Sequence, residues 1–249
     1  PGAMEVQQLM AELLAQPVEQ EIALRGDDRF VSRIVQRPKD KSGTISLSPE
    51  GSYLITGGFG ALGLLVAKLL AERGAKHLVL VSRRGAPEGS EDALDELQQL
   101  GATVTVGKAD ASNEDQMRAL FDNAKAAGHP IVGAIHSAGV IDDKMLMDLD
   151  WSSFEKVMAA KVAGARNLHM LMQDPSHEFC VFFSSATSAI GNVGQANYAA
   201  ANMFLDSLAK HRRASGLPGL SINWGPWSEV GMAAALDAKT FEAGGLGLI

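Results

Sequence analysis

Short apolar runs alternate with stretches of helical periodicity from residue 52 onward, and this alternation constrains the fold more than any other feature of the sequence. The apolar runs are SYLIT (52–56), HLVLVS (77–82), TVTVG (103–107), IVGAIHS (131–137), FCVFFSS (179–185) and LSINW (220–224). Helical patterns separate them, at about 60–73, 90–100, 113–127, 152–173 and 197–214. Apolar strands that alternate with helices are typical of a parallel sheet buried on both sides. The sequence therefore predicts an α/β fold: a doubly wound parallel sheet with helices on both faces.

Residues 1–50 precede this pattern and are too few to bury a core of their own. Residues 4–15 indicate a short helix, residues 21–35 alternate like a β-hairpin, and the polar, turn-rich residues 36–51 are typical of a linker. We expect residues 1–50 to be the end of a neighbouring domain or a strap on the main one. The main domain is then residues 51–249, and we expect a further strand to follow its last residues.

Composition excludes several classes of function. The net charge is −7 and no basic stripe is evident, so nucleic acid is not an expected partner. No apolar run reaches the length that spans a membrane, and no secretory signal is evident. Cys180 is the one cysteine and lies within an apolar run, which favours a buried thiol in a reducing compartment. We expect a cytoplasmic protein without a membrane partner or a metal site.

The first apolar run leads directly into TGGFGALG (56–63), in which Gly58, Gly60 and Gly63 form a G-x-G-x-x-G pattern. Such glycines permit a tight turn and let backbone N–H groups approach a pyrophosphate at a helix N-terminus. The alternative is a glycine-rich turn without a ligand. Because a strand precedes the motif and a helix follows it, the sequence predicts a Rossmann-like dinucleotide site. Its expected contacts in this loop are Gly57, Gly58, Gly60, Ala61 and Leu62.

The second apolar run ends in SRRG (82–85), where a fold that prefers NAD usually carries an acidic residue for the ribose 2′-hydroxyl. This chain offers Arg83 and Arg84 beside Ser82, and guanidinium groups suit a 2′-phosphate. The sequence therefore predicts NADPH as the cofactor. The alternative is that one of the two arginines is simply a solvated loop residue.

Two further loops complete the predicted cofactor site. After the third run, Asp110 and Ala111 are placed to meet the adenine, with helix capping by Asp110 as the alternative. The fourth run ends in HSAG, which keeps its loop small enough for close approach to a cofactor. The residues expected to contact the cofactor there are Ser137, Ala138 and Gly139.

The helical pattern at 152–173 carries an unusual lysine. The pattern begins with Ser152 and Glu155 in capping-box spacing, and its apolar stripe includes Lys161 but not Lys156. A lysine on a buried face is costly unless it is paired or used. On spacing alone, Lys161 is either a functional residue or a lysine whose ammonium reaches solvent at the edge of the stripe, and Lys156 is solvated.

Tyr198 favours the functional reading. It begins a helical run thirteen positions after Ser185, which ends the fifth apolar run, so both residues fall at the carboxyl edge of the sheet, where ligands bind. The free pKa of tyrosine, about 10, makes it a poor acid at neutral pH without a cation beside it. One helical turn later stands Asn202, which carries no charge. Since the helix of Lys161 flanks the same edge, we expect its ammonium to serve Tyr198.

At these residues the chain resembles the short-chain dehydrogenases/reductases, and more closely the ketoreductase domains of modular polyketide synthases. Ordinary members carry a lysine four residues after the tyrosine, whereas in synthase ketoreductases the lysine and an asparagine exchange places, as Lys161 and Asn202 do here. The segments SRRG, HSAG, FFSS, NYAAAN and NWGPW also match in order. The resemblance covers roughly residues 50–249, and residues 21–35 are similar to the end of the structural subdomain of that family.

The resemblance implies a mechanism. NADPH would reduce the β-carbonyl of an acyl chain that an acyl carrier protein presents as a phosphopantetheine thioester, and the other domains of the same synthase would be partners. Tyr198 would donate the proton, Lys161 would lower its pKa, Ser185 would hydrogen-bond the carbonyl oxygen, and Asn202 would orient the site. Lys161, Tyr198 and Pro226 would also contact the cofactor. Residues 228–245, about Met232, would form a lid over the substrate.

The resemblance also implies a stereochemical class. Ketoreductases that form the D-configured alcohol (B-type) usually carry Leu-Asp-Asp after the fourth strand, and this chain has Ile141-Asp142-Asp143. The other class usually has a tryptophan where Ile190 stands. Gln195 joins residues 141–143 as an expected substrate and stereocontrol residue, and Ala200, in place of a proline, implies no epimerisation. The alternative for Asp142 and Asp143 is a pair of solvated loop acids.

Two other functions remain open at this level. One is a free-standing short-chain dehydrogenase that acts on a diffusible alcohol or ketone; the exchanged lysine and the upstream hairpin speak against it. The other is a redox-silent scaffold domain of a synthase, although such domains usually lose the tyrosine or the nucleotide loop, and both are present here.

Overall fold

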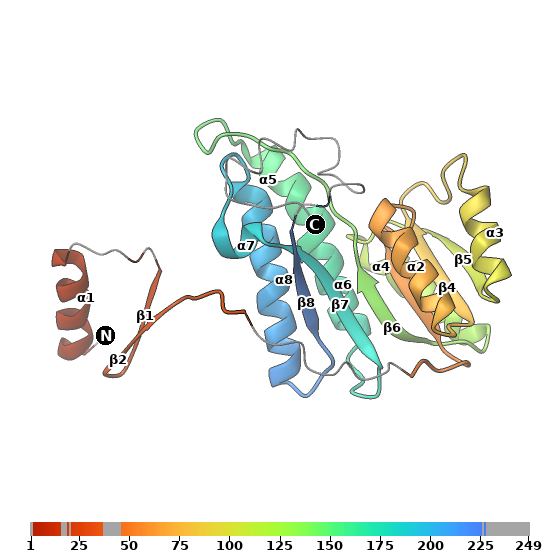
Figure 1. The fold of residues 1–249 in the computed structure, drawn as a ribbon, viewed down its shortest axis with the longest axis horizontal. Coiled ribbons are helices and arrows are strands. Elements are labelled where there is room, and N and C mark those ends of the chain that lie inside the picture. Colours follow the sequence, from red (N-terminus) through yellow and green to blue (C-terminus); the bar gives the residue numbers. More distant parts are fainter. Residues whose placement is uncertain (1, 16–18, 20, 37–45, 226, 228–249) are drawn as a thin grey trace. The chain divides into compact units, whose positions relative to one another are not determined.

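The computed structural model describes residues 2–15, 19, 21–36, 46–225 and 227, and the chain divides into two units, residues 1–44 and 45–249 (Figure 1). The first unit contains helix α1 (Ala3–Leu14) and an antiparallel hairpin of β1 (Ile22–Arg25) and β2 (Asp28–Val31). Gly26 supplies the positive φ of 58° that the hairpin turn needs. The helix and the hairpin expected from the sequence are therefore both present.

The second unit is built on a six-stranded parallel sheet (Figure 1). The strand order is β5-β4-β3-β6-β7-β8, so the order reverses between β3 and β6. In doubly wound sheets such a reversal opens a crevice at the carboxyl ends of the two strands, where ligands bind. The strands are β3 (Ser52–Thr56), β4 (His77–Ser82), β5 (Thr103–Lys108), β6 (Ile131–His136), β7 (Phe179–Ser185) and β8 (Leu220–Trp224).

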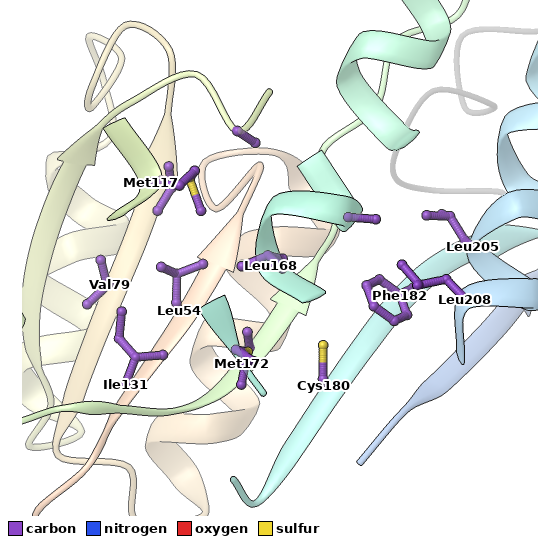
Figure 2. Packing of buried hydrophobic residues seen from close by; sticks show 14 of the residues in the cluster. Leu54, Val79, Met117, Ile131, Leu168, Met172, Cys180, Phe182, Leu205 and Leu208 are labelled. Atoms are coloured by element: carbon purple, nitrogen blue, oxygen red, sulfur yellow. The ribbon is translucent and has the colours of Figure 1, made fainter. Parts of the chain in front are cut away.

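Helices cover both faces of the sheet, as predicted. Leu54 and Val79 pack with α4, α6 and α8 in one buried cluster, part of which Figure 2 shows, whereas Tyr53 and Leu78 pack with α2 and α3 in another. Neighbouring residues of one strand point to opposite faces, so each central strand must be apolar throughout. Cys180 is buried in the first cluster, as its apolar surroundings predicted. These helices are α2 (Ala61–Glu72), α3 (Glu91–Gln99), α4 (Glu114–Ala126), α6 (Gly164–Leu171) and α8 (Ala196–Ala214).

The helix expected at 152–173 is not one regular helix. It begins as α5 (Trp151–Met158), passes through a π-helical turn at Ala159–Ala163 and continues as α6. The predicted capping box of Ser152 and Glu155 is wrong: the N-cap is Asp150, whose carboxylate accepts the Ser153 N–H at 2.7 Å. Asp150 takes this role because Ser152 already lies inside the first turn.

Other differences are small. The fourth strand ends at His136 rather than at residue 137, and a short helix, α7 (Thr187–Ile190), follows β7 without having been predicted. Pro226 and the expected lid at 228–245 lie outside the described residues. Within the part of the chain that the structure describes, no helix combines the length and the apolar character that crossing a membrane requires.

Candidate active site

The glycine loop joins β3 to the N-terminus of α2 at the point where the strand order reverses. Gly57 has a φ of 65°, and a Cβ on it would lie 2.9 Å from the backbone nitrogen of Ala138, in the loop after β6. A Cβ on Gly63 would meet the carbonyl oxygen of Gly57 at 2.3 Å. The first turn of α2 therefore approaches the glycine loop, and the glycine loop approaches the loop after β6, more closely than a side chain allows. The N–H groups at this helix start lie where an anion would be stabilised.

A cavity of about 360 Å³ opens beside this loop. Its walls come from the carboxyl ends of β3, β4, β5 and β6 and from the start of α2, which is the predicted edge of the sheet. The predicted cofactor contacts that line it are Gly57, Gly60, Ala61, Leu62, Ser82, Arg83, Asp110, Ala111, Ser137, Ala138 and Gly139.

Some predicted contacts lie elsewhere. Gly58 does not line the cavity: its N–H bonds to the carbonyl of Val81 at 3.2 Å, and a Cβ on it would lie 2.9 Å from Cβ of Leu80. Close packing between the loop and β4 thus requires a glycine at position 58. Lys161 and Tyr198 are not wall residues of this cavity either, although Gly139, which is one, lies against the Lys161 side chain.

Several wall residues were not predicted. Most are small or apolar strand-end residues without a distinctive sequence signal, but Lys156 is a cation. Its side chain is 59% exposed, as its place off the apolar stripe predicted, yet it also reaches the cavity wall. The unpredicted wall residues are Thr56, Val81, Ala109, Ser112, Val140, Lys156, Ala159 and Ala160.

The two arginines lie where this cavity meets a second hollow: Arg83 lines both, and Arg84 lines the hollow alone. Arg83 and Arg84 are exposed, and both line an adjoining hollow that also includes Gly57 and Ser82. Asp110 lies on the cavity wall, where Ser112 donates both its N–H and its hydroxyl to the Asp110 carboxylate. Burial raises the pKa of Asp110, but these hydrogen bonds and the charge of Arg83 outweigh it and leave the pKa below its ordinary value. Asp110 does not cap α4, because the N-cap is Asn113.

Lys161 lies in the π-helical turn, and its side chain is buried, with 3% of its surface exposed. Its Nζ donates to the carbonyl oxygen of Phe183 in β7 at 2.9 Å. Burial lowers the pKa of Lys161 to about 8, although the negative charge of Asp206 opposes the shift. The reading of Lys161 as a lysine whose ammonium reaches solvent is therefore wrong.

Tyr198 lies beside this ammonium. The Nζ of Lys161 stands 5.3 Å from the centre of the Tyr198 ring, over its face, and the ring packs with Val157 and Ala201. Burial raises the pKa of Tyr198, and the charge of Asp143 adds to the rise, while the polar side chain of Asn202 opposes it. The expected lowering of the Tyr198 pKa by Lys161 is therefore wrong, because burial dominates, although the two groups do lie in cation–π contact.

The remaining two predicted catalytic residues are Ser185, at the end of β7, and Asn202, one turn after Tyr198 in α8. Ser185 ends β7, and its hydroxyl oxygen accepts the N–H of Thr187 at 3.2 Å, so its own proton can serve another acceptor. Asn202 is fully buried; its Nδ2 donates to the Tyr198 carbonyl at 2.8 Å, while its Oδ1 has no hydrogen-bond partner among the described residues. A buried acceptor of this kind suits a water or a ligand group.

The loop after β6 is tied to the start of α8 and to α5. Gln195 donates to the carboxylate of Asp143 at 2.8 Å, and Lys156 pairs with Asp142 at 3.1 Å. Both acids therefore have partners and are not merely solvated. Ile141 packs against the cluster that holds Tyr198. The predicted stereocontrol residues thus form one border of the tyrosine site.

Sequence reasoning missed Asn197, which organises this border. It is fully buried, its Nδ2 donates to the carbonyl of Asp142 at 2.9 Å, and its Oδ1 accepts the N–H of Tyr198 at 2.8 Å. One side chain thus fixes both the loop after β6 and the first turn of α8. Its position directly before Tyr198 was the available signal.

Comparison with solved structures shows the same fold. The chain matches a structure described as an A-type ketoreductase from a modular polyketide synthase with a TM-score of 0.87 and 40% identity, over 93% of this chain and 50% of that one. An A1-type ketoreductase matches with a TM-score of 0.88 and 38% identity, over 97% of this chain and 51% of that one. The chain thus spans about half the length of each solved chain.

Sequence comparison agrees. Polyketide synthase GfsB of Streptomyces halstedii is 44% identical over 219 residues, which are 86% of this chain and 4% of that protein. The chain is therefore similar to a small part of a much longer synthase. The model of the KR domain family matches residues 51–229, which include the glycine loop, Lys161 and Tyr198. The chain belongs to this family, the ketoreductase domains of modular polyketide synthases.

Proposed function

We propose that this domain uses NADPH to reduce the β-keto group of an acyl chain bound to an acyl carrier protein, and that the product is the D-configured β-hydroxyacyl thioester. The observation that carries the proposal is the meeting of Lys161 and Tyr198 beside a cavity with the glycine loop in its wall. A single hydrogen bond to the Phe183 carbonyl does little to offset the cost of burying the Lys161 ammonium, so its place next to a buried phenol favours a functional role.

The residues have distinct roles in this proposal. When bound, NADPH supplies the hydride that the carbonyl carbon accepts. Tyr198 donates its proton to the oxygen, as a general acid that burial keeps protonated at neutral pH. The ammonium of Lys161 favours the phenolate that remains, and the hydroxyl of Ser185 aims the carbonyl oxygen. Asn202 offers its free Oδ1 to a water that orders the site.

The preference for NADPH rests on the arginines. Arg83 lines the nucleotide cavity, and Arg84 lines the hollow beside it. The 2′-phosphate would meet these guanidinium groups, with the carboxylate of Glu88 as the one opposing charge among the described residues that line the hollow. Lys156 adds a third positive charge to the cavity wall, where it would attract a polyanionic cofactor.

The D-configuration rests on residues 141–143 and on Ile190. The solved structures described above are of A-type and A1-type enzymes, but a shared fold does not fix the direction from which a substrate enters. In this chain Gln195 donates to the carboxylate of Asp143 at 2.8 Å, which holds this loop against the start of α8. Ile190 leaves that position without the tryptophan of the other class.

The partners follow from the relatives. The matched proteins are polyketide synthases or their ketoreductase domains, so the substrate would arrive on a carrier domain, and other synthase domains would flank this one. The net charge of −7 speaks against nucleic acid as a partner. The proposed location is the cytoplasm.

The test is turnover of defined thioesters. The purified protein, assayed with NADPH and a panel of diketide and triketide β-ketoacyl thioesters on a carrier protein, should form β-hydroxy products that chiral chromatography identifies as D-configured. A preference for free alcohols or ketones would instead favour a free-standing dehydrogenase. NADPH binding by fluorescence titration without turnover would favour a redox-silent scaffold. An L-configured product would refute the stereochemical part alone.

A further inference from the structure

His136 is a fully buried imidazole between the nucleotide loop and the candidate catalytic lysine. It ends β6, next to Thr56 at the end of β3, and the two residues are register partners in the sheet. Its Nδ1 lies 2.7 Å from the hydroxyl oxygen of Thr56, and its Nε2 lies 3.1 Å from the carbonyl oxygen of Lys161. Both ring nitrogens are therefore used, and one of their partners is the backbone of the lysine itself.

The direction of these hydrogen bonds follows from the partners. A carbonyl oxygen can only accept, so Nε2 carries the hydrogen and donates a hydrogen bond to the Lys161 carbonyl oxygen. Nδ1 is then the acceptor, and the Thr56 hydroxyl donates a hydrogen bond to it. The same hydroxyl oxygen accepts the backbone N–H of Ala138, in the loop after β6, at 3.3 Å. One chain of hydrogen bonds thus runs from Ala138, a cavity wall residue, to the backbone of Lys161.

The imidazole stays neutral in this position. Burial, together with the charge of Lys161, lowers the pKa of His136 to about 3, against the effect of the backbone carbonyls. A protonated ring could not accept from Thr56. The hydrogen-bond chain is therefore intact throughout the pH range in which an enzyme of this kind would work.

The packing around this chain leaves little freedom. A Cβ on Gly164 would lie 2.6 Å from Cε1 of His136, so only glycine lets the helix come this close to the ring. A Cβ on Gly139 would lie 3.0 Å from Cε of Lys161. The lysine lies in a π-helical turn, an irregularity often found at functional sites because it shifts one residue relative to the rest of its helix.

We propose that His136 is a positioning residue, which holds the π-helical turn through the carbonyl of Lys161 and so sets where the ammonium stands relative to Tyr198 and the nucleotide loop. The proposal rests on the catalytic role of Lys161 in the proposed function. It assigns His136 no contact with substrate or cofactor. Its physical basis is that a side chain can be placed only as accurately as the backbone that carries it.

Two substitutions separate the two hydrogen bonds of the ring. His136→Gln keeps an N–H at the distance of Nε2 and can still donate to Lys161. His136→Asn keeps an oxygen at the distance of Nδ1, can still accept from Thr56, and cannot reach Lys161. Tyr53→Phe is the matched control, because it removes a buried hydroxyl that donates to Glu178 from the opposite end of β3.

We expect His136→Asn to lower kcat roughly 10- to 100-fold, with KM for the thioester and Kd for NADPH within about twofold of wild type. His136→Gln should retain most of kcat, and Tyr53→Phe should change thermal stability alone. If His136 had a purely structural role, the melting temperature of both His136 variants would fall, and the loss of kcat would not be confined to His136→Asn. Equal losses of kcat in the two folded variants, or no loss in either, would overturn the proposal.

Two spectroscopic readouts do not depend on turnover. The ¹³Cε resonance of Lys161 should shift in His136→Asn and stay in place in His136→Gln, even if the wild-type protein reduces no thioester and the proposed function fails. Should neither variant fold, the imidazole ¹⁵N signals of the wild-type protein decide. The Nε2–H tautomer between pH 6 and pH 8 supports the proposal, whereas the Nδ1–H tautomer or an imidazolium refutes it.

Discussion

The ammonium of Lys161 stands over the ring of Tyr198, 5.3 Å from its centre, although the two residues belong to different helices. What brings them together is β7, because Lys161 donates to the carbonyl of Phe183 in that strand while Ser184 of the same strand donates to the carbonyl of Asn202 in α8. The strand thus connects the two helices directly behind the candidate active site. The ammonium therefore reaches the Tyr198 ring from a neighbouring helix rather than from the helix that carries the tyrosine.

Tyr198→Phe should abolish most of the NADPH-dependent reduction, because the variant has no proton to give to the carbonyl oxygen. General acid catalysis contributes about 10² to 10⁴-fold, so a loss of that order in kcat is expected. The measurement is single-substrate kinetics with NADPH oxidation as the signal. Circular dichroism and the melting temperature should match wild type, and substantial residual turnover in a folded variant would contradict the role.

Lys161→Ala should reduce kcat by a similar order, because the phenolate loses its neighbouring cation. Lys156 is not a neutral control, because it lines the cavity beside the glycine loop and pairs with Asp142. Lys210, which is exposed on α8, is the better match. Lys210→Ala should leave kcat and KM unchanged, and equal effects of the two substitutions would mean that the buried ammonium has no part in the reaction.

The pH dependence of the reaction should reveal the ammonium of Lys161. Burial lowers the pKa of this lysine from its ordinary 10.5 to about 8, so the charged form dominates below that pH and is lost above it. We expect kcat/KM for NADPH, which reports the free enzyme, to fall as the pH rises above about 8. A profile that stays flat to pH 10 would contradict this assignment.

Asp206→Asn is a second test of whether the titration of Lys161 determines the alkaline fall in kcat/KM. The charge of Asp206 raises the pKa of Lys161, so its removal should move the alkaline fall in kcat/KM to lower pH. The Asp206 carboxylate also accepts hydrogen bonds from Ser188, Ser221 and Asn223, and the substitution will cost stability. Ser221→Ala removes one of these bonds but no charge, so it should lower the melting temperature without moving the pH profile.

The sequence predicted the elements of the sheet because each of them is dictated locally. Central strands such as 77–82 are apolar throughout, since both faces are buried, and the glycine loop has a fixed place after the first of them. The ends of helices were less predictable. At α5 an aspartate two residues before the expected cap takes the role, and periodicity could not distinguish Asp150 from Ser152.

The candidate site was predictable to the extent that its residues carry rare chemistry. A lysine on an apolar stripe and a tyrosine at a helix start are conspicuous, and both are buried at the expected edge. His136 and Asn197 were missed because their roles depend on partners distant in sequence, such as Lys161 for the imidazole and Asp142 for the amide. The π-helical turn at Ala159–Ala163 was not predicted, because a shift of one residue is too small to interrupt the apolar stripe.

The two arginines should determine the choice of cofactor. Arg83 borders the nucleotide cavity directly, whereas Arg84 borders only the adjoining hollow. Loss of a charge-assisted contact to a phosphate costs roughly 1.5 to 3 kcal/mol, so Arg83→Ala should raise KM for NADPH about 10-fold or more and leave KM for NADH nearly unchanged. Arg84→Ala should have a smaller effect. If wild type uses NADH as readily as NADPH, the proposed 2′-phosphate site is refuted.

The hydrogen bond from Gln195 to Asp143 should govern the stereochemical outcome. It joins the loop after β6 to the start of α8, and both segments border Tyr198. Gln195→Ala removes the donor and frees the loop, so we expect a larger fraction of the minor alcohol and a higher KM for the thioester, with Kd for NADPH unchanged. Lys144→Ala is the control, because it removes an exposed ion pair with Asp150 from the same loop and leaves Asp143 in place. Product ratios from chiral chromatography decide the matter: if Gln195→Ala and Lys144→Ala give the same ratio as wild type, the loop does not select the face of the carbonyl that accepts the hydride.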